Sequence, residues 1–176
     1  AGFTHWAKLN NLKQAAKTMN FLTEHGISSY GELESKLNAV SARRDTAHAE
    51  IKRIESRSAE LALVMKHAGT YRQLKPLYDR YRKSNDKEKF LRGHESEIIL
   101  FEAAARELKR LGAVPLPTTE SMKTELANLN AEKERLLAEY KAARTEAQEY
   151  DTVKQNVDAL LAVPKEQKQQ RRHELE

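Results

Sequence analysis

Two apolar stripes with a period of about 3.5 residues constrain the fold of this chain more than any other feature of its sequence. One stripe steps by four and three residues through Met122, Leu126, Leu129, Lys133, Leu136, Tyr140, Ala143, Ala147, Tyr150, Lys154, Val157 and Leu161. The other steps in the same way through Leu33, Leu37, Val40, Arg44, Ala47, Ile51, Ile54, Ser58, Leu61, Met65 and Ala68. Because this period keeps one helix face against a partner helix, each stripe predicts the seam of a coiled coil.

The two stripes are similar in length, so the simplest fold pairs them antiparallel, with Thr70–Pro117 forming the turn. The predicted fold class is all-α: an elongated antiparallel coiled-coil hairpin with additional shorter helices. A hydrophobic content of 39% beside 32% charged residues agrees with long helices that have one apolar face. We expect the polar seam residues Arg44, Ser58, Lys133 and Lys154 to fix the register of the pair.

Glycine and proline predict where the first helices end. An N-terminal helix is expected over residues 1–26, because Gly26 is suited to the left-handed conformation that ends a helix. The first long helix is expected over about 30–68. Between Gly69 and Pro76 we expect a bend or a restart, because a proline inside a helix removes one hydrogen bond and clashes with the preceding turn.

The second half of the chain is predicted in the same way. Intervening helices are expected over 70–111, and the second long helix over 119–163. Pro164 is expected to end that helix and to leave 164–176 as a polar, flexible tail. Residues 27–163 are thus predicted to form one helical coiled-coil module.

Capping residues mark the predicted helix starts. Ser28 or Ser29 can cap the first long helix, Asp86 a third helix from Lys87 to Leu111, and Thr118 or Thr119 the last. The apolar face of the third helix is predicted to consist of Phe90, His94, Ile98, Phe101, Ala105 and Leu108, broadened by Ile99, Leu100 and Ala104.

Positive charge is concentrated in residues 70–94. Eight basic and three acidic residues lie there, so this stretch accounts for the whole net charge of +5. Interleaved cations and tyrosines can bind phosphates and stack on bases, which predicts contact with DNA. The candidate DNA-binding residues are Arg72, Lys75, Tyr78, Arg80, Tyr81, Arg82, Lys83, Lys87, Lys89 and Arg92. The alternative is that the tyrosines form the buried face of a helix and the cations its solvated face.

Signals of catalysis and of metal binding are missing from the sequence. There is no cysteine, the six histidines form neither His-x-His nor His-Glu-x-x-His, and the six glycines are scattered singly. We therefore expect no catalytic residue, no metal, no cofactor and no enzyme activity. The lack of cysteine fits a cytoplasmic protein, and no apolar run approaches the length of about 18 residues that a membrane span needs.

Two segments resemble a known family. Residues 3–26 (FTHWAKLNNLKQAAKTMNFLTEHG) and 78–98 (YDRYRKSNDKEKFLRGHESEI) resemble relaxases, the mobilisation nucleases of conjugative elements in Gram-positive bacteria. In those proteins such segments lie in a helical C-terminal portion that follows the nuclease domain. The resemblance extends from Gly2 to about Val163 and implies that this chain is a piece of a longer, DNA-nicking relaxase.

The family cuts one DNA strand with a tyrosine that becomes covalently joined to the DNA, beside a metal held by a histidine cluster. That cluster has no counterpart here, so no catalytic residue carries over. The resemblance implies a non-catalytic module in plasmid or transposon mobilisation, with DNA as a partner through the basic stretch. The alternative is a protein-interaction or dimerisation scaffold whose coiled coil docks a second copy, a relaxosome protein or a secretion protein. Neither interpretation includes insertion into a membrane.

Overall fold

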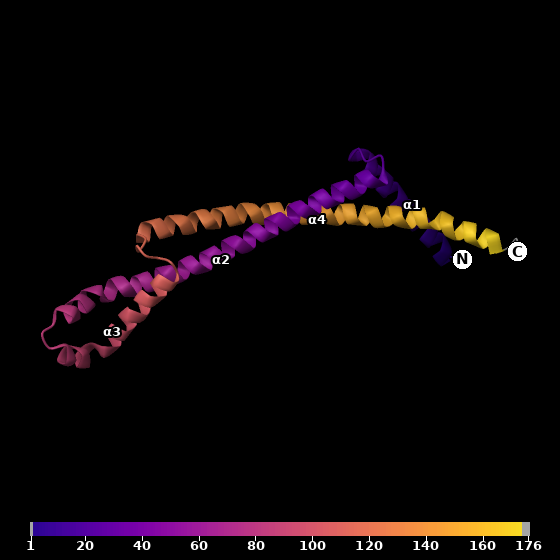
Figure 1. The fold of residues 1–176 in the computed structure, drawn as a ribbon. Coiled ribbons are helices and arrows are strands. Elements are labelled where there is room, and N and C mark those ends of the chain that lie inside the picture. Colours follow the sequence, from indigo (N-terminus) through magenta and orange to yellow (C-terminus); the bar gives the residue numbers. More distant parts are fainter. Residues whose placement is uncertain (1, 174–176) are drawn as a thin grey trace. The chain divides into compact units, whose positions relative to one another are not determined.

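The computed structural model describes residues 2–173, and side chains over residues 10–162. Residues 2–173 form four helices and no strand: α1 (Gly2–Glu24), α2 (Tyr30–Lys83), α3 (Lys87–Arg110) and α4 (Thr119–His173) (Figure 1). The all-α fold class is thus confirmed. The chain divides into two compact units, to which α2 and α4 both contribute: unit 1 comprises residues 1–48 and 137–176, and unit 2 comprises residues 49–136. None of the described helices is long and apolar enough to cross a membrane.

The predicted caps are present at the helix ends. Gly26 has φ +62°, and the N–H of Ile27 donates to the carbonyl of Leu22 at 2.8 Å, which closes α1 as a Schellman motif. Ser29 caps α2, because its Oγ accepts from the N–H of Glu32 at 3.2 Å. Thr118 caps α4 through the N–H of Ser121 in the same way, at 3.1 Å.

Neither Pro76 nor Pro164 ends a helix, so the predicted restart near Pro76 and the predicted end at Pro164 are wrong. The helix α2 continues through Gly69 and Pro76 to Lys83, so the first long helix does not end near residue 68. A proline removes one backbone hydrogen bond, and packing on both sides of it can hold the helix together despite that loss. The helix α4 likewise continues past Pro164 to His173, and the rest of the predicted tail, 174–176, lies outside the described residues.

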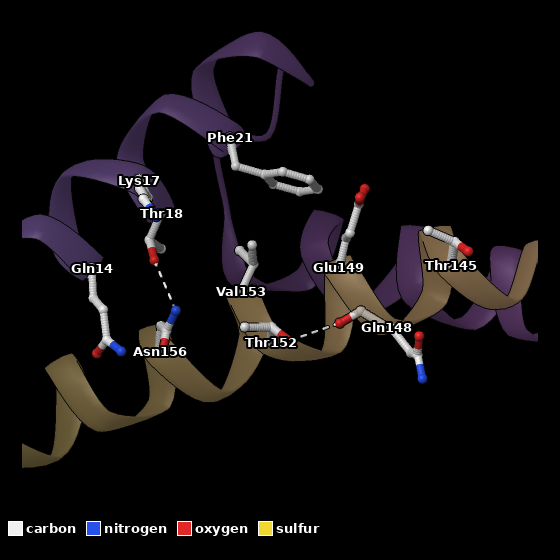
Figure 2. Close-up of a pocket in the computed structure, with 10 residues that line it drawn as sticks. All are labelled: Gln14, Lys17, Thr18, Phe21, Thr145, Gln148, Glu149, Thr152, Val153 and Asn156. Carbon is white, nitrogen blue, oxygen red and sulfur yellow. Dashed lines mark hydrogen bonds between the residues drawn. The ribbon is translucent and has the colours of Figure 1, made fainter. Parts of the chain in front are cut away.

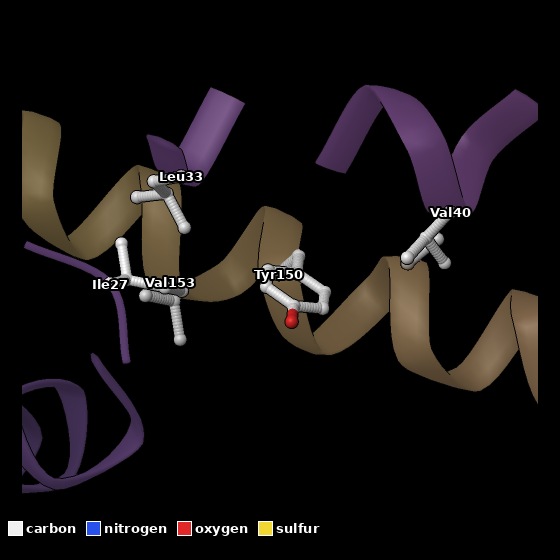
Figure 3. Close-up of a cluster of buried hydrophobic side chains, with 6 residues drawn as sticks. Ile27, Leu33, Val40, Tyr150 and Val153 are labelled. Atoms are coloured by element: carbon white, nitrogen blue, oxygen red, sulfur yellow. The ribbon is translucent and has the colours of Figure 1, made fainter. Parts of the chain in front are cut away.

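Unit 1 packs the start of α2 against the later part of α4, with α1 alongside. Figure 3 shows its core, which consists of Ile27, Leu33, Val40, Ala147, Tyr150 and Val153. The Oη of Tyr30 donates to Asp158 at 2.7 Å, whereas Arg43 is paired with Glu146, earlier in α4. Later positions of α2 therefore meet earlier positions of α4, and the two helices run antiparallel in this unit.

Unit 2 joins three helices around a second core. Its buried residues are Leu61, Val64, Ala68, Leu108, Ala113 and Met122. The Nζ of Lys133 lies 2.9 Å from Glu55, and Arg57 donates to Glu125 at 2.7 Å. Here too α2 and α4 run antiparallel.

The predicted seams are the buried faces of α2 and α4. Every position of the stripe from Leu33 to Ala68 is buried or half-buried, and the same holds for the stripe from Met122 to Leu161 except Leu161 itself, which is 57% exposed. The polar seam residues differ in what they contact. Lys133 reaches across to Glu55, and Lys154 lies 3.9 Å from Glu34, so both support the register. Arg44 instead pairs with its neighbour Asp45.

One side of α3 is buried, and this corrects its predicted face. Ile98, Phe101, Ala104 and Leu108 are buried as predicted, but Ile99 is 54% and Leu100 is 55% exposed. The i, i+3 and i+4 spacing of the buried residues turns one side of α3 to the core, and positions 99 and 100 lie off that side. The helix also bends at His94, whose φ of −142° and ψ of 24° are not helical.

Candidate nucleic-acid interface

Six of the predicted DNA-binding residues gather where α2 ends and α3 begins, within unit 2. We call this surface the basic tip. It comprises the exposed residues Arg80, Arg82, Lys83, Lys87, Lys89 and Arg92. The first three lie in the last turn of α2 and the others in the first two turns of α3.

A short hydrogen-bonded turn brings these two groups of cations together. The N–H of Ser84 donates to the carbonyl of Tyr81 at 3.2 Å, and the Oγ of Ser84 donates to the carbonyl of Asp86 at 3.0 Å. The carboxylate of Asp86 caps α3, because it accepts from the N–H of Lys89 at 2.9 Å. The N–H of Phe90 bonds to the carbonyl of Asp86 at 3.2 Å and starts the helical pattern. The turn is therefore fixed locally, and the tip has a defined shape.

Positive charge dominates the basic tip. Only Asp86 and Glu88 bring negative charge between residues 80 and 92, and the carboxylate of Asp86 is already bonded to the backbone. Among the described residues, no carboxylate lies within ion-pair distance of any of the six cations. Their charges are thus available to an anion from outside the chain.

Helix dipoles explain only half of this arrangement. Cations such as Arg82 and Lys83 in the last turn of α2 are favoured by its negative end, worth about 0.3–1 kcal/mol each. Lys87 and Lys89 lie in the first turn of α3, where the positive end of the dipole disfavours a cation. Helix stability alone therefore does not account for the second group.

Two other predicted residues, Arg72 and Lys75, are engaged within the fold. The guanidinium of Arg72 donates to the Oγ1 of Thr119 at 2.8 Å and to the carbonyl of Pro117, which fastens α2 to the start of α4 in unit 2. The ammonium of Lys75 lies 3.0 Å from the carboxylate of Asp79, and this hydrogen bond raises the pKa of Lys75. The charged groups of Arg72 and Lys75 are thus already bonded to other groups of the chain.

The two remaining candidates, Tyr78 and Tyr81, belong to a row of six rings that joins α2 to α3. We call this row the aromatic ladder, and its successive rings are Tyr71, Phe101, Tyr78, Tyr81, Phe90 and His94. Successive ring centroids lie 4.8, 4.1, 5.9, 6.1 and 4.8 Å apart. The tyrosines are half-buried, and their spacing of seven and three is the spacing of a packed helix face.

The sequence identified both faces of this ladder but not their pairing. The spacing of Tyr71, Tyr78 and Tyr81 is that of one helix face, and Phe90 and Phe101 lie on the predicted face of the next helix. Which ring stacks on which depends on how α3 folds back along α2, and no local spacing encodes that. The ladder holds the two helix ends together and so supports the basic tip.

His94 ends the ladder at the bend of α3. Its Nδ1 is buried without a hydrogen-bond partner among the described residues and lies 3.7 Å from the carboxylate of Glu97. In the described part of the chain, no three His, Asp or Glu side chains come together in a group that could hold a metal ion.

Unit 1 contains a separate groove between α1 and α4, with a volume of about 500 Å³ (Figure 2). Six of the ten residues that line it carry a hydroxyl or an amide group; the ten are Gln14, Lys17, Thr18, Phe21, Thr145, Gln148, Glu149, Thr152, Val153 and Asn156. The amide of Asn156 donates to the Oγ1 of the buried Thr18 at 3.2 Å. Lys17 and Glu149 are the ionisable residues of this lining. The groove therefore offers neither paired carboxylates nor a nucleophile beside a histidine.

Comparison with known proteins finds no matching family model, no similar curated protein and no similar solved structure. The resemblance to relaxases therefore stays a prediction from the sequence.

Proposed function

We propose that this chain is a non-catalytic helical module of a relaxase, and that it holds DNA at the basic tip during conjugative transfer. Two observations support the proposal. One of the two segments that resemble relaxases, residues 78–98, contains all of the basic tip. The observation that carries it is the gathering of six exposed cations with no carboxylate partner among the described residues.

The chemistry of the tip suits a polyphosphate. Lysine and arginine that neutralise DNA phosphates release condensed counterions, so the logarithm of the affinity falls with the logarithm of salt concentration by about 0.9 per contacted phosphate of duplex DNA. If all six cations of the tip make such contacts, the slope is about −5. The tip would supply affinity and orientation, because phosphate contacts carry little sequence information.

A titration of labelled DNA against the protein at several salt concentrations tests this proposal. The variant Arg80→Gln/Arg82→Gln/Lys83→Gln should bind more weakly, with a slope smaller in magnitude by about 2.7, because three phosphate contacts are lost. A matched control is Lys52→Gln/Lys66→Gln/Lys123→Gln, which removes three exposed cations of unit 2 outside the tip. Equal affinity and equal slope for the two triple variants would refute the proposal, as would the absence of DNA binding at low salt.

A second candidate function is a protein-interaction or dimerisation scaffold. Its support is the exposed apolar pair Ile99 and Leu100 on α3. This function predicts self-association that the double variant Ile99→Glu/Leu100→Glu abolishes, with DNA affinity unchanged. Sedimentation velocity measures the association, and a monomer at every concentration would remove the dimer from consideration.

A further inference from the structure

We infer that the basic tip binds duplex DNA through its phosphates in preference to single-stranded DNA. This inference rests on the proposed function and specifies which form of DNA the tip holds. Two features of unit 2 carry it: the engagement of the aromatic rings and the spacing of the cations.

Proteins that bind single strands without sequence preference combine a basic groove with aromatic side chains on which successive bases stack. The rings nearest the basic tip, Tyr78, Tyr81 and Phe90, are members of the aromatic ladder. Tyr78 stacks on Phe101 with centroids 4.1 Å apart, and Tyr81 has Tyr78 at 5.9 Å on one side and Phe90 at 6.1 Å on the other. A base that stacked on these rings would have to displace contacts that hold α3 on α2.

Separating such ring pairs costs about 0.5–1.5 kcal/mol each beyond the loss of buried area. A stacked base returns about 1–3 kcal/mol. Separating two ring pairs in order to stack one base therefore gains little free energy, so the rings of the ladder remain packed on one another. The basic tip therefore binds DNA through its charges.

Charge spacing distinguishes the two forms of DNA. At a rise of 1.5 Å per residue, the cations of α3, from Lys87 to Arg92, span about 8 Å of helix axis. Over about 8 Å, duplex DNA presents roughly five phosphates, at one charge per 1.7 Å, whereas an extended single strand presents about two. These three cations outnumber the phosphates that the single strand presents over this span but not those of the duplex, so the duplex can neutralise them more completely.

The experiment compares a labelled duplex with the single strand of the same sequence and length, each titrated with the whole chain at two salt concentrations. We expect at least tenfold tighter binding to the duplex at the lower salt concentration, with a steeper salt dependence. The variant Tyr81→Leu should change affinity for either form no more than twofold, because no base stacks on that ring. Loss of a stacked base would instead weaken single-strand binding about 5- to 150-fold.

The ring-retaining variant Tyr81→Phe, together with the helical circular-dichroism signal, controls for damage to the ladder itself. Equal or tighter binding of the single strand, or a loss above fivefold in Tyr81→Leu that Tyr81→Phe does not show, would overturn the inference and leave DNA contact at the tip intact. No binding to either DNA would overturn the proposed function, and the inference with it.

Discussion

The substitution Phe101→Ala should release α3 from α2. Phe101 is 5% exposed and stacks on two rings of α2, with centroids 4.8 Å from Tyr71 and 4.1 Å from Tyr78. It thus lies in the aromatic ladder between two rings from different turns of α2. Removing its ring takes away both stacked pairs and leaves a cavity between the helices.

The expected cost follows from these contacts. Burial of a phenylalanine side chain contributes about 1.5–3 kcal/mol, and two stacked pairs add about 1–3 kcal/mol together. The sum agrees with the cost of about 3–5 kcal/mol for deleting a buried phenylalanine ring. Phe101→Leu keeps most of the buried area but loses the stacking, so it should cost about 1–3 kcal/mol.

Native-state hydrogen exchange of the α3 amides measures the effect locally. A loss of about 4 kcal/mol corresponds to an acceleration of about 1,000-fold in exchange, until the rate of unprotected amides is reached. Ile99→Ala is the control on the same helix, because Ile99 is 54% exposed and its truncation should change stability by about 0.5 kcal/mol or less. If α3 protection in Phe101→Ala stayed within tenfold of the unsubstituted protein, the ladder would not hold the helix, and the reasoning would be wrong.

Three further predictions concern the seam, the glycines and the acid response. Leu33→Ala in the unit 1 core should lower the free energy of unfolding, measured with denaturant, by about 2–5 kcal/mol. Leu161→Ala, at an exposed position of the seam, should lower it by less than about 0.5 kcal/mol, and equal losses in the two variants would contradict the observed burial. Gly26→Ala should destabilise the protein by about 1–2 kcal/mol because Gly26 has φ +62°. Gly69→Ala should stabilise it by about 0.5–1 kcal/mol, because Gly69 lies inside α2 and an added Cβ would meet open space. Thermal unfolding of the two variants measures both signs. Backbone and side-chain hydrogen bonds from Ser28 lower the pKa of Glu32 below its ordinary 4.5, so the stability that Glu32 contributes to the fold is present above pH 4.5 and is lost as the pH falls through the lowered pKa. The difference in melting temperature between the unsubstituted protein and Glu32→Gln should therefore disappear in acid, and a difference that persists at pH 2 would refute this.

Local signals in the sequence determined the helices, their seams and most of their ends. The 3.5-residue period placed Leu33, Val40 and Ile54 on the buried face of α2 because a helix repeats its faces at a spacing that can be counted along the chain. Gly26 and Asp86 were identified as cap residues because a cap acts on backbone groups within three or four residues of it.

Contacts between distant residues decided the rest. The local chemistry of proline predicts that Pro76 interrupts a helix, yet α2 continues through it. Tyr71 and Tyr78, which lie on either side of Pro76, both stack on Phe101. The sequence likewise grouped Arg72 with the cations of the basic tip. Its bonds to Pro117 and Thr119, which lie 45 and 47 residues away along the chain, fix it within the fold instead. Composition shows where charge and aromatic rings are abundant, but only the path of the folded chain brings together the partners that use them or leaves them free.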